Sequence, residues 1–519
     1  MGTAAALADV NRQERPVASM PNEVELKLRI RAADIPRLKK HSAVQSALVG
    51  KPIMRKLASI YYDTPALALL DAGISLRVRR MSGGWFQAVK GAGHSLAGLH
   101  QRTEWEDIIA HGEPDFSKIT EPALTKIFDD RELRAALRPI FTTDVRRTEW
   151  QLAPAEGSKV EMALDIGNLI VDQAREPISE VELELKEGEP ARLFEFALAL
   201  LEDIPLWIEN ISKAQRGYAY YRPQPPQLRH ARQVNLRPAM TLEEACRTIL
   251  WECIGHLQGN HDIVAQHGDA EGVHQMRIAL RRMRSAMAIF AGFMSPADDL
   301  REELEWLATT LGEARDLDVF LTETLPPMQR QLPHAGLEIL HRKALKAHRA
   351  AYAEIRDALD SQRYQRLLLR LGAWLEGGDH KKHEEPLADF ARDLLQKRHR
   401  KLRRLGKRWH GMSAEERHAA RIAAKKLRYA AEFFASLFAE EKSKRYLRRL
   451  ANLQGILGDL NDIAATDRLI AGLAGFRPSQ ASREAQWLCA GWNGLQAKRK
   501  MAKLDYRWNR FTQTGPFWN

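Results

Sequence analysis

The stretch Asn22-Glu-Val-Glu-Leu-Lys-Leu-Arg-Ile30 alternates polar and apolar residues, so every second side chain is of the same kind. Such alternation is typical of a β-strand, in which successive side chains point to opposite faces. One face would carry Glu23, Glu25, Lys27 and Arg29, and the other only aliphatic side chains. We therefore expect a strand that is apolar on one side and charged, with both signs, on the other.

Further segments before residue 222 repeat this alternation. They are Ser75–Arg80, Trp85–Lys90, Gln101–Glu106, Thr143–Trp150, Lys159–Asp165 and Ser179–Lys186. An open sheet with one solvated face would explain any one of them. The whole set favours a closed barrel of about eight strands, because Glu180, Glu182 and Glu184 would repel one another unless cations lie among them. Charges inside a barrel need partners, and a phosphate chain with divalent metals would supply them.

The order of these residues resembles the CYTH, or triphosphate tunnel metalloenzyme, family. Glu23-x-Glu25-x-Lys27 resembles the ExExK signature, which is short on its own, and the ordered set that follows it makes the resemblance specific. That set is Tyr61-Tyr62-Asp63-Thr64 before a short helix, Leu76-Arg77-Val78-Arg79, Lys90, Arg102-x-Glu104, Asp165-x-Gly167, Glu182-x-Glu184 and Ser212-Lys213-Ala-Gln-Arg216-Gly217-Tyr218.

The resemblance implies an eight-stranded antiparallel tunnel whose members hydrolyse inorganic triphosphate or thiamine triphosphate, or cyclise ATP. It implies that Glu23, Glu25 and Lys27 are the catalytic motif. By the same resemblance the triphosphate would be bound by Lys27, Arg77, Arg79, Lys90, Arg102, Arg147 and Lys213. Mg²⁺ or Mn²⁺ would be held by Glu23, Glu25, Glu104, Glu182 and Glu184.

Three details of this assignment stay open. Arg147 is preferred to Arg146 on strand parity alone. Asp165 would either ligate a metal or shape a turn with Gly167, and we weigh the two equally. Gln87-Ala-Val-Lys90 lacks a threonine that sometimes precedes this lysine in the family, which affects fine substrate positioning rather than the phosphate contacts.

The charge of the chain divides at a proline-rich break, Arg222-Pro-Gln-Pro-Pro-Gln-Leu. Residues 1–222 hold 30 basic and 32 acidic side chains, a net charge of −2. Residues 223–519 hold the other 49 basic and 35 acidic ones, a net charge of +14, and the whole chain carries +12. We expect a disordered segment at 1–20, a tunnel domain at 21–222, a linker at 223–236 and a helical domain at 237–515. A strongly basic domain favours a polyanionic partner.

The helical region is duplicated. Val273–Ser285 resembles Arg417–Tyr429 at an offset of 144, and Leu311–Asp318 resembles the segment that begins at Leu457 at an offset of 146. Two helical bundles, at about 237–375 and 385–515, are the simplest architecture. The first helix would begin with a capping box at Thr241-Leu-Glu-Glu244.

Basic residues recur on one face of each duplicated helix. This pattern resembles that of the CHAD family (conserved histidine α-helical domain). A solvated face or pairing with Asp316, Asp318 and Asp462 would explain one such run, but an in-register duplicate favours an anion-binding groove. The resemblance, over about 237–510, implies binding of inorganic polyphosphate. The implied residues are His274, Arg277, Arg281, Arg282, Arg284, His418, Arg421, Lys425, Lys426 and Arg428. The histidines are expected to be hydrogen-bonded groove members rather than metal ligands.

The sequence thus predicts an α+β protein of two domains: an eight-stranded antiparallel β-tunnel with flanking helices, then an all-α duplicated bundle. The pair resembles bacterial CYTH-CHAD inorganic triphosphatases. The function predicted first is metal-dependent hydrolysis of inorganic triphosphate with polyphosphate bound by the helices. The alternatives are a thiamine triphosphatase or adenylate cyclase of the same family, and a non-catalytic polyphosphate-binding protein.

Other classes are disfavoured. No apolar stretch is long enough to span a membrane, no signal peptide is evident, and Cys246, Cys253 and Cys489 fit neither a disulfide framework nor a zinc motif. Nucleic acid ranks below polyphosphate because few aromatic residues interleave with the basic ones. A cytoplasmic location is expected. The helical domain would either hold long chains near the tunnel or localise the protein to polyphosphate granules.

Overall fold

The computed structural model describes residues 22–91, 93–296, 298–377, 384–406, 412–475 and 479–518. They form two compact units. The first holds the residues up to Pro225 together with a helix that begins at Gln362, and the second holds the rest. The segment 1–20, expected to be disordered, lies outside the described residues.

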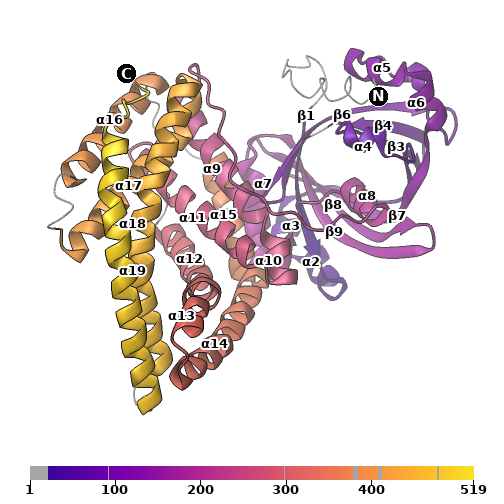
Figure 1. Ribbon diagram of the computed structural model, residues 1–519. Helices are drawn as coiled ribbons and strands as arrows, with labels where there is room; N and C mark the ends of the chain where they lie inside the picture. Colours follow the sequence, from indigo (N-terminus) through magenta and orange to yellow (C-terminus); the bar gives the residue numbers. More distant parts are fainter. Residues whose placement is uncertain are drawn as a thin grey trace. The chain divides into compact units, whose positions relative to one another are not determined.

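Eight strands of the first unit close into an antiparallel barrel, seen nearly end-on in Figure 1. Around the ring they are β1 (Asn22–Ile30), β9 (Ala174–Glu187), β8 (Lys159–Val171), β7 (Arg138–Leu152), β2 (Leu48–Asp63), β3 (Ser75–Met81), β4 (Gly84–Lys90) and β6 (Leu99–Ile109), which pairs back with β1. Two short strands, β5 (His94–Leu96) and β10 (Leu206–Ile208), pair with β6 and β1. The predicted eight-stranded antiparallel barrel is confirmed.

The alternation of the strands separates an apolar outer face from a charged inner face. On β1, Leu26 and Leu28 are fully buried, and helix α7 (Ala191–Leu201) packs against β1 and β9. On β3, Leu76 and Val78 join a buried cluster with helix α5 (Pro122–Phe128). The intervening residues of these strands therefore point into the barrel.

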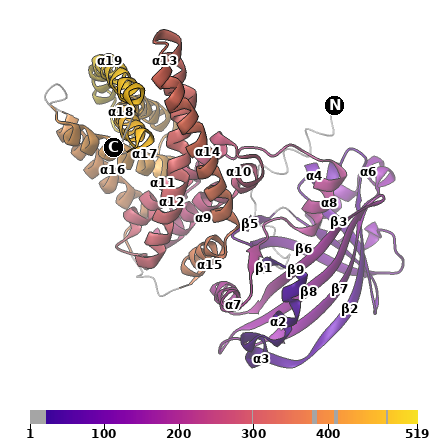
Figure 2. The same cartoon turned by 90° about the horizontal axis from the view of Figure 1, so that it is seen from below.

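Strand β2 was missed by the sequence analysis. It contains Pro52, and its register against β7 shifts between Val49 and Ile53. A proline cannot donate to the sheet ladder, and a register shift breaks the alternation on which the prediction relied. Figure 2 shows β2, β7 and β8 as the long strands of one wall.

Helix α8 (Lys213–Tyr221) is packed against β7 and β8 and begins with a capping box between Ser212 and Gln215. Its Tyr218 packs with Tyr61 and Phe141 in a buried cluster. A Cβ atom at Gly217 would lie 2.2 Å from the Phe141 ring, so only glycine allows this close approach. Helix α8 thus packs Tyr218 into an apolar cluster and places its first residue, Lys213, beside the charged part of the barrel.

The remaining helices of the first unit are short, except for one that comes from far along the chain. They are η1 (Ala32–Asp34), α2 (Ile35–Lys40), α3 (Ser42–Ala47), α4 (Ala68–Asp71), η2 (Phe116–Lys118), α6 (Arg131–Ala136) and the longer α15 (Gln362–Glu376). Helix α15 falls inside the range expected for the first helical repeat, yet it packs on α7.

The described residues of the second unit form helices and the segments that connect them, with no strand among them. Its elements are α9 (Leu242–Gln258), α10 (His261–His267), α11 (Ala270–Phe290), α12 (Asp298–Val319), the π-helix η3 (Phe320–Thr324), α13 (Leu325–Gln331), α14 (Ala335–Asp360), α16 (Leu387–Leu405), α17 (Ala414–Phe434), η5 (Ala435–Leu437), α18 (Glu440–Ala474) and α19 (Gln480–Thr512). The predicted capping box at Thr241 and Glu244 is present.

The packing order of these helices repeats. In the first half α9 packs on α11, α11 on α12 and α12 on α14; in the second α16 packs on α17, α17 on α18 and α18 on α19. The duplicated basic helices are α11 and α17, and they also contact each other. Two copies of one four-helix pattern therefore meet through the helices that carry the basic faces, and also through α14, which packs on α18 and α19.

The proline-rich segment 223–236, expected to be a linker, packs on the second unit from Pro226 onward. Val234 and Leu236 are buried, and the Leu236 N–H donates to Ser436 Oγ at 2.9 Å. Proline prevents helix formation here but leaves alternate side chains free to pack. Among the described helices, none combines the length and apolarity needed to cross a membrane.

Candidate functional site

Strand register sets acids and bases side by side on the inner face of the barrel. Glu23 lies opposite Arg102, Lys27 opposite Glu182, and Arg147 opposite Asp165. Directly opposed residues of neighbouring strands have Cβ atoms about 5 Å apart, so opposite charges can pair. The strand parity that selected Arg147 over Arg146 agrees with this register, since Arg147 and not Arg146 lines the barrel cavity.

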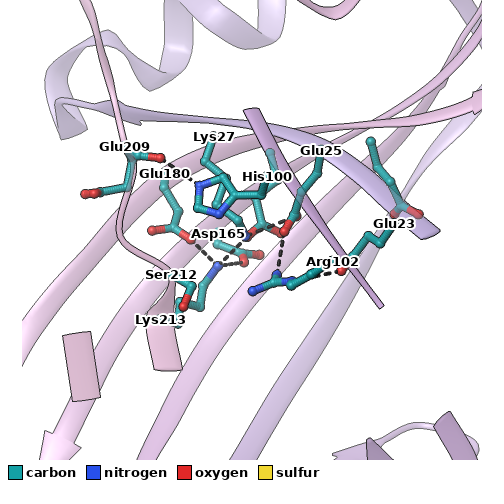
Figure 3. A network of polar contacts seen from close by, with 12 residues as sticks. Glu23, Glu25, Lys27, His100, Arg102, Asp165, Glu180, Glu209, Ser212 and Lys213 are labelled. Carbon is teal, nitrogen blue, oxygen red and sulfur yellow. Dashed lines mark hydrogen bonds and ion pairs between the residues drawn. The ribbon is translucent and has the colours of Figure 1, made fainter. Parts of the chain in front are cut away.

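One cavity of about 250 Å³ collects all the tunnel residues predicted from the sequence. They are Glu23, Glu25, Lys27, Arg77, Arg79, Lys90, Arg102, Glu104, Arg147, Glu182, Glu184 and Lys213. Figure 3 shows several of them from close by, with Lys27, Arg102 and Lys213 pointing toward the carboxylates of the neighbouring strands.

The cavity wall holds equal numbers of opposite charges. Seven lysines and arginines line it, and so do seven glutamates when Glu106 and Glu161 are added to the predicted five. Lys90 Nζ lies 2.8 Å from Glu23 and 2.9 Å from Glu104, and Arg102 Nε lies 3.2 Å from Glu23. Burial alone would raise the pKa of Glu23, but Lys90 and Arg102 outweigh it and lower that pKa. The wall charges are thus partners for one another.

Arg79 is the exception among these cations. In the described structure it makes no ion pair within 4.0 Å, and its Nε donates to Ser59 Oγ at 3.0 Å. Burial, followed by the charges of Arg77 and Arg147, lowers the pKa of Arg79 to about 10. Arg77 is buried as well, and its Nε has no hydrogen-bond partner. Arg79 thus has guanidinium donors that no wall carboxylate occupies, and Arg77 has one buried donor without a partner.

Lys213 lies at the centre of a buried acidic cluster formed by Asp165, Glu180 and Glu182. Its Nζ is 2.7 Å from Asp165 and 2.8 Å from Glu182. Burial lowers the pKa of Lys213, but the three carboxylates outweigh it and raise that pKa. The geometry of this cluster would suit a cation, and the ammonium group takes that place.

Asp165 belongs to this cluster and not to a turn. It lies with Gly167 inside strand β8, and its two oxygens accept from Arg147 Nε and Nη2, both at 2.7 Å. Burial would raise the pKa of Asp165, but Lys213 and Arg147 outweigh it and lower that pKa to about 2. Gly167 is needed because a Cβ there would lie 2.0 Å from the Asp144 carbonyl oxygen. The turn-shaping alternative is therefore wrong.

A second set of carboxylates lies side by side in register, although among the described residues only Asp165, Glu180 and Glu182 bring their oxygens together closely enough for one cation. Register places Glu184 directly between Glu25 and Glu161 on three adjacent strands. Burial, Glu23 and Glu161 raise the pKa of Glu184, against the opposing effect of its partner Lys186. A carboxylate whose pKa is raised by its surroundings is stabilised by a nearby cation, and carboxylate oxygens suit Mg²⁺ and Mn²⁺.

Three ionisable side chains of this cavity, Tyr61, Glu106 and Glu161, were not among the predicted site residues. Glu106 and Glu161 share the strand parity of Glu104 and Asp165, so alternation alone would have found them. Tyr61 lies in the missed strand β2 and stacks on Phe141 with ring centres 4.4 Å apart. Burial would raise the pKa of Tyr61, but Arg77, Arg79 and Lys213 outweigh it and lower that pKa.

The second unit contains a basic groove along α11 and α17. Two cavities, of about 800 and 400 Å³, share His274, Arg281, Arg421 and Lys425 on their walls. The predicted basic residues on these walls are His274, Arg277, Arg281, Arg282, His418, Arg421, Lys425 and Arg428. Arg284 and Lys426 lie on exposed faces away from both cavities.

The groove has more positive than negative charge. Its two cavities are lined by ten lysines and arginines and by five carboxylates. Burial, Arg421 and Arg281 lower the pKa of Lys425 to about 7. The Nε atoms of Arg281 and Arg421 are buried without a hydrogen-bond partner.

Three observations on this groove bear on the sequence analysis. His230 and Arg232, from the proline-rich segment, also line the larger cavity and were not predicted. His418 Nδ1 lies 3.2 Å from Asn461 Oδ1, in keeping with the expected hydrogen-bonded histidine. Gly312, in the motif that precedes Asp318, leaves room for Arg277, since a Cβ would lie 2.4 Å from its Nη1.

Comparison with known proteins gives matches for both units. The family model of the CYTH domain matches residues 21–218, and that of the CHAD domain matches residues 248–471. The crystal structure of the CHAD domain from the plant Ricinus communis is 34% identical, with a TM-score of 0.50, and the match covers 55% of this chain and 97% of that one.

The match to a second relative spans a smaller share of that relative's length. The inorganic triphosphatase of Haemophilus influenzae (strain ATCC 51907 / DSM 11121 / KW20 / Rd) is 33% identical over 200 residues, which is 38% of this chain and 55% of that protein. The match thus spans about half the length of that relative. With the closed barrel and the duplicated helices, these findings show that the chain belongs to the CYTH family through its N-terminal domain and to the CHAD family through its C-terminal domain.

Proposed function

We propose that the barrel hydrolyses inorganic triphosphate with the help of Mg²⁺ or Mn²⁺, and that the basic groove binds inorganic polyphosphate. The observation that carries the first part is the single cavity lined by seven cations and seven carboxylates. The likeness to the Haemophilus influenzae inorganic triphosphatase supports the same substrate.

Arg79 and Arg77 would make the first contacts with the phosphate chain, because they have donors that wall carboxylates do not use. Phosphoryl transfer depends mainly on neutralising charge and aligning the attacking water, and arginines are suited to phosphate oxygens. Lys27, Lys90 and Arg102 would join them by exchanging a carboxylate partner for a phosphate oxygen.

That exchange explains why the substrate would need a metal. Each cation that turns to phosphate leaves a buried carboxylate without its partner, at a cost that grows with burial. The carboxylates that would then hold a divalent cation are Glu23, Glu25, Glu104, Glu182 and Glu184, with Glu161 beside them. Such a cation, when bound, neutralises phosphate oxygens and lowers the pKa of a coordinated water. Charge balance therefore favours substrate and metal entering together.

The test is phosphate release by the purified chain with Mg²⁺ or Mn²⁺. The substrates are inorganic triphosphate, ATP, thiamine triphosphate and long-chain polyphosphate. We expect selective release from inorganic triphosphate. Preferred hydrolysis of thiamine triphosphate, or formation of cyclic AMP from ATP, would identify one of the alternative family activities. No turnover of any substrate would refute the catalytic proposal.

A polyphosphate-binding function of the second unit rests on a separate observation. The groove has twice as many basic as acidic residues and two buried arginine Nε atoms without partners. A long polyanion would satisfy these donors along the length of α11 and α17. Binding of long-chain polyphosphate in competition with RNA at physiological salt tests this, and stronger binding of RNA would refute it. Granule association would follow from the same binding.

A further inference from the structure

Helix α15 is structurally part of the barrel unit although its sequence lies among the helices of the C-terminal region. It packs on α7 closely enough that a Cβ at Gly372 would lie 2.2 Å from the Phe194 ring. Arg366 forms an ion pair with Glu202 at the end of α7. Because only glycine fits at this contact, α15 is closely packed against α7.

The same helix satisfies the free edge of strand β10. One edge of β10 pairs with β1, with Ile208 opposite Leu28 and Leu206 opposite Ile30. On the other edge the Leu206 N–H donates to Gln362 Oε1 at 2.9 Å, and the Ile208 N–H donates to Gln365 Oε1 at 3.0 Å. Two glutamines one helical turn apart thus match two edge amides two residues apart.

Strand β10 leads directly to Lys213. The Glu209 N–H donates to the Lys27 carbonyl oxygen at 2.9 Å, so β10 and the segment after it are bonded to the strand of the ExExK motif. The Asn210 side chain accepts from the Gly98 N–H at 2.8 Å, and the Glu209 carbonyl oxygen lies 2.9 Å from His100 Nε2. Figure 3 shows Glu209, His100 and Lys213 around the acidic cluster. These hydrogen bonds constrain the short segment between β10 and Lys213.

We propose that Gln362 and Gln365 are positioning residues for the tunnel: by holding the outer edge of β10, α15 fixes the segment that places Lys213 among Asp165, Glu180 and Glu182. A helix from the C-terminal region thereby completes the site of the N-terminal domain. The inference rests on the proposed hydrolysis only for its kinetic readout.

The test uses the full chain and a matched pair of substitutions. Gln362→Leu removes the acceptor of the Leu206 N–H, whereas Gln362→Glu keeps an acceptor oxygen at the same place. Replacing Gln362 Nε2 by the second carboxylate oxygen breaks no hydrogen bond, because Nε2 is buried without a partner. The double variant Gln362→Leu/Gln365→Leu removes both acceptors.

Three readouts are followed in each variant. They are hydrogen exchange of peptides covering residues 204–212, the rate at which acetic anhydride labels Lys213, and kcat and KM for inorganic triphosphate. In the double leucine variant we expect exchange and Lys213 labelling to rise about tenfold or more and kcat to fall about tenfold. Gln362→Leu should show part of each effect. Gln362→Glu keeps the acceptor but buries a charged oxygen where Nε2 lies, so it should fall between Gln362→Leu and the unaltered chain.

The outcomes separate this inference from the proposed function. Unchanged exchange in the double leucine variant would show that the glutamines do not hold β10. Faster exchange with unchanged Lys213 labelling would make α15 only a cover, and would overturn the positioning role. If the unaltered chain hydrolyses nothing, the proposed function fails, and the exchange and labelling results still decide the inference.

Discussion

The tunnel and the groove are both rich in cationic side chains, but they differ in how those charges are balanced. The tunnel wall pairs seven lysines and arginines with seven glutamates, whereas the groove has ten lysines and arginines against five carboxylates. An anion bound in a balanced site leaves excess negative charge, so charge balance favours a cation that enters with it. A site with excess positive charge attracts an anion by itself. The first arrangement suits a metal-dependent reaction on a short substrate, and the second suits binding of a long polyanion.

The largest effect is expected from Arg79, the tunnel cation without a carboxylate partner. Arg79→Gln should lower kcat/KM for inorganic triphosphate by roughly 100- to 1,000-fold, the usual cost of removing one well-placed donor to a reacting oxyanion. Arg80→Gln is the matched control, because Arg80 lies on the exposed face of the same strand, over the Trp85 ring. Equal losses in the two variants would show that the strand, and not the inward charge, is what matters.

Ionic strength should separate the two sites. Raising salt from about 50 to 200 mM should weaken polyphosphate binding by roughly 10- to 100-fold, because a groove with excess positive charge exchanges counterions for phosphates. The kcat/KM for triphosphate should change by less than about threefold if the paired tunnel charges are screened less. Calorimetry and phosphate-release assays at matched salt measure the two. Equal salt sensitivity would remove the distinction between a balanced and an unbalanced site.

Much of the tunnel could be predicted because strand alternation fixes which side chains share a face. From Glu23 to Lys213, each predicted tunnel residue lines the cavity. Strand β2 could not be found in this way, because Pro52 and a shifted register break the alternation. The mutual pairing of the wall charges also escaped the sequence, since alternation gives the face of a residue but not its neighbour across the barrel.

The helical region was harder to predict in detail. Duplication of the basic helices indicated a shared groove, and eight of the ten implied residues line it. Helix periodicity did not show that Arg284 pairs with Glu305 on an exposed face or that α15 joins the barrel unit. Both depend on which apolar surface a helix packs against, and α15 offers buried leucines on several sides.

Neighbouring lysines on α17 test whether the groove, rather than the basic helix as a whole, binds polyphosphate. Lys425 lines both cavities, and Lys426 is exposed outside them. Lys425→Gln should weaken polyphosphate binding about tenfold, and Lys426→Gln by less than about twofold, because only the first removes a charge from a partly desolvated site. Fluorescence titration with long-chain polyphosphate measures both. A larger loss at Lys426 would place the polyanion on the outer face.

The smallest effect concerns pH and the same lysine. Burial and the neighbouring arginines lower the pKa of Lys425 to about 7, so its charge is lost as the pH rises through neutrality. A bound polyanion favours the charged form, and polyphosphate affinity should therefore fall about three- to tenfold between pH 6.5 and 8.5. Lys425→Arg keeps its charge over this range and should bind with nearly constant affinity. The tunnel supplies the contrast within the same molecule: the pKa of Lys213 is raised by its three carboxylates, so this lysine keeps its charge throughout. An affinity that falls equally in the unaltered chain and in Lys425→Arg would mean that another group titrates, and that the excess charge of the groove does not act on Lys425.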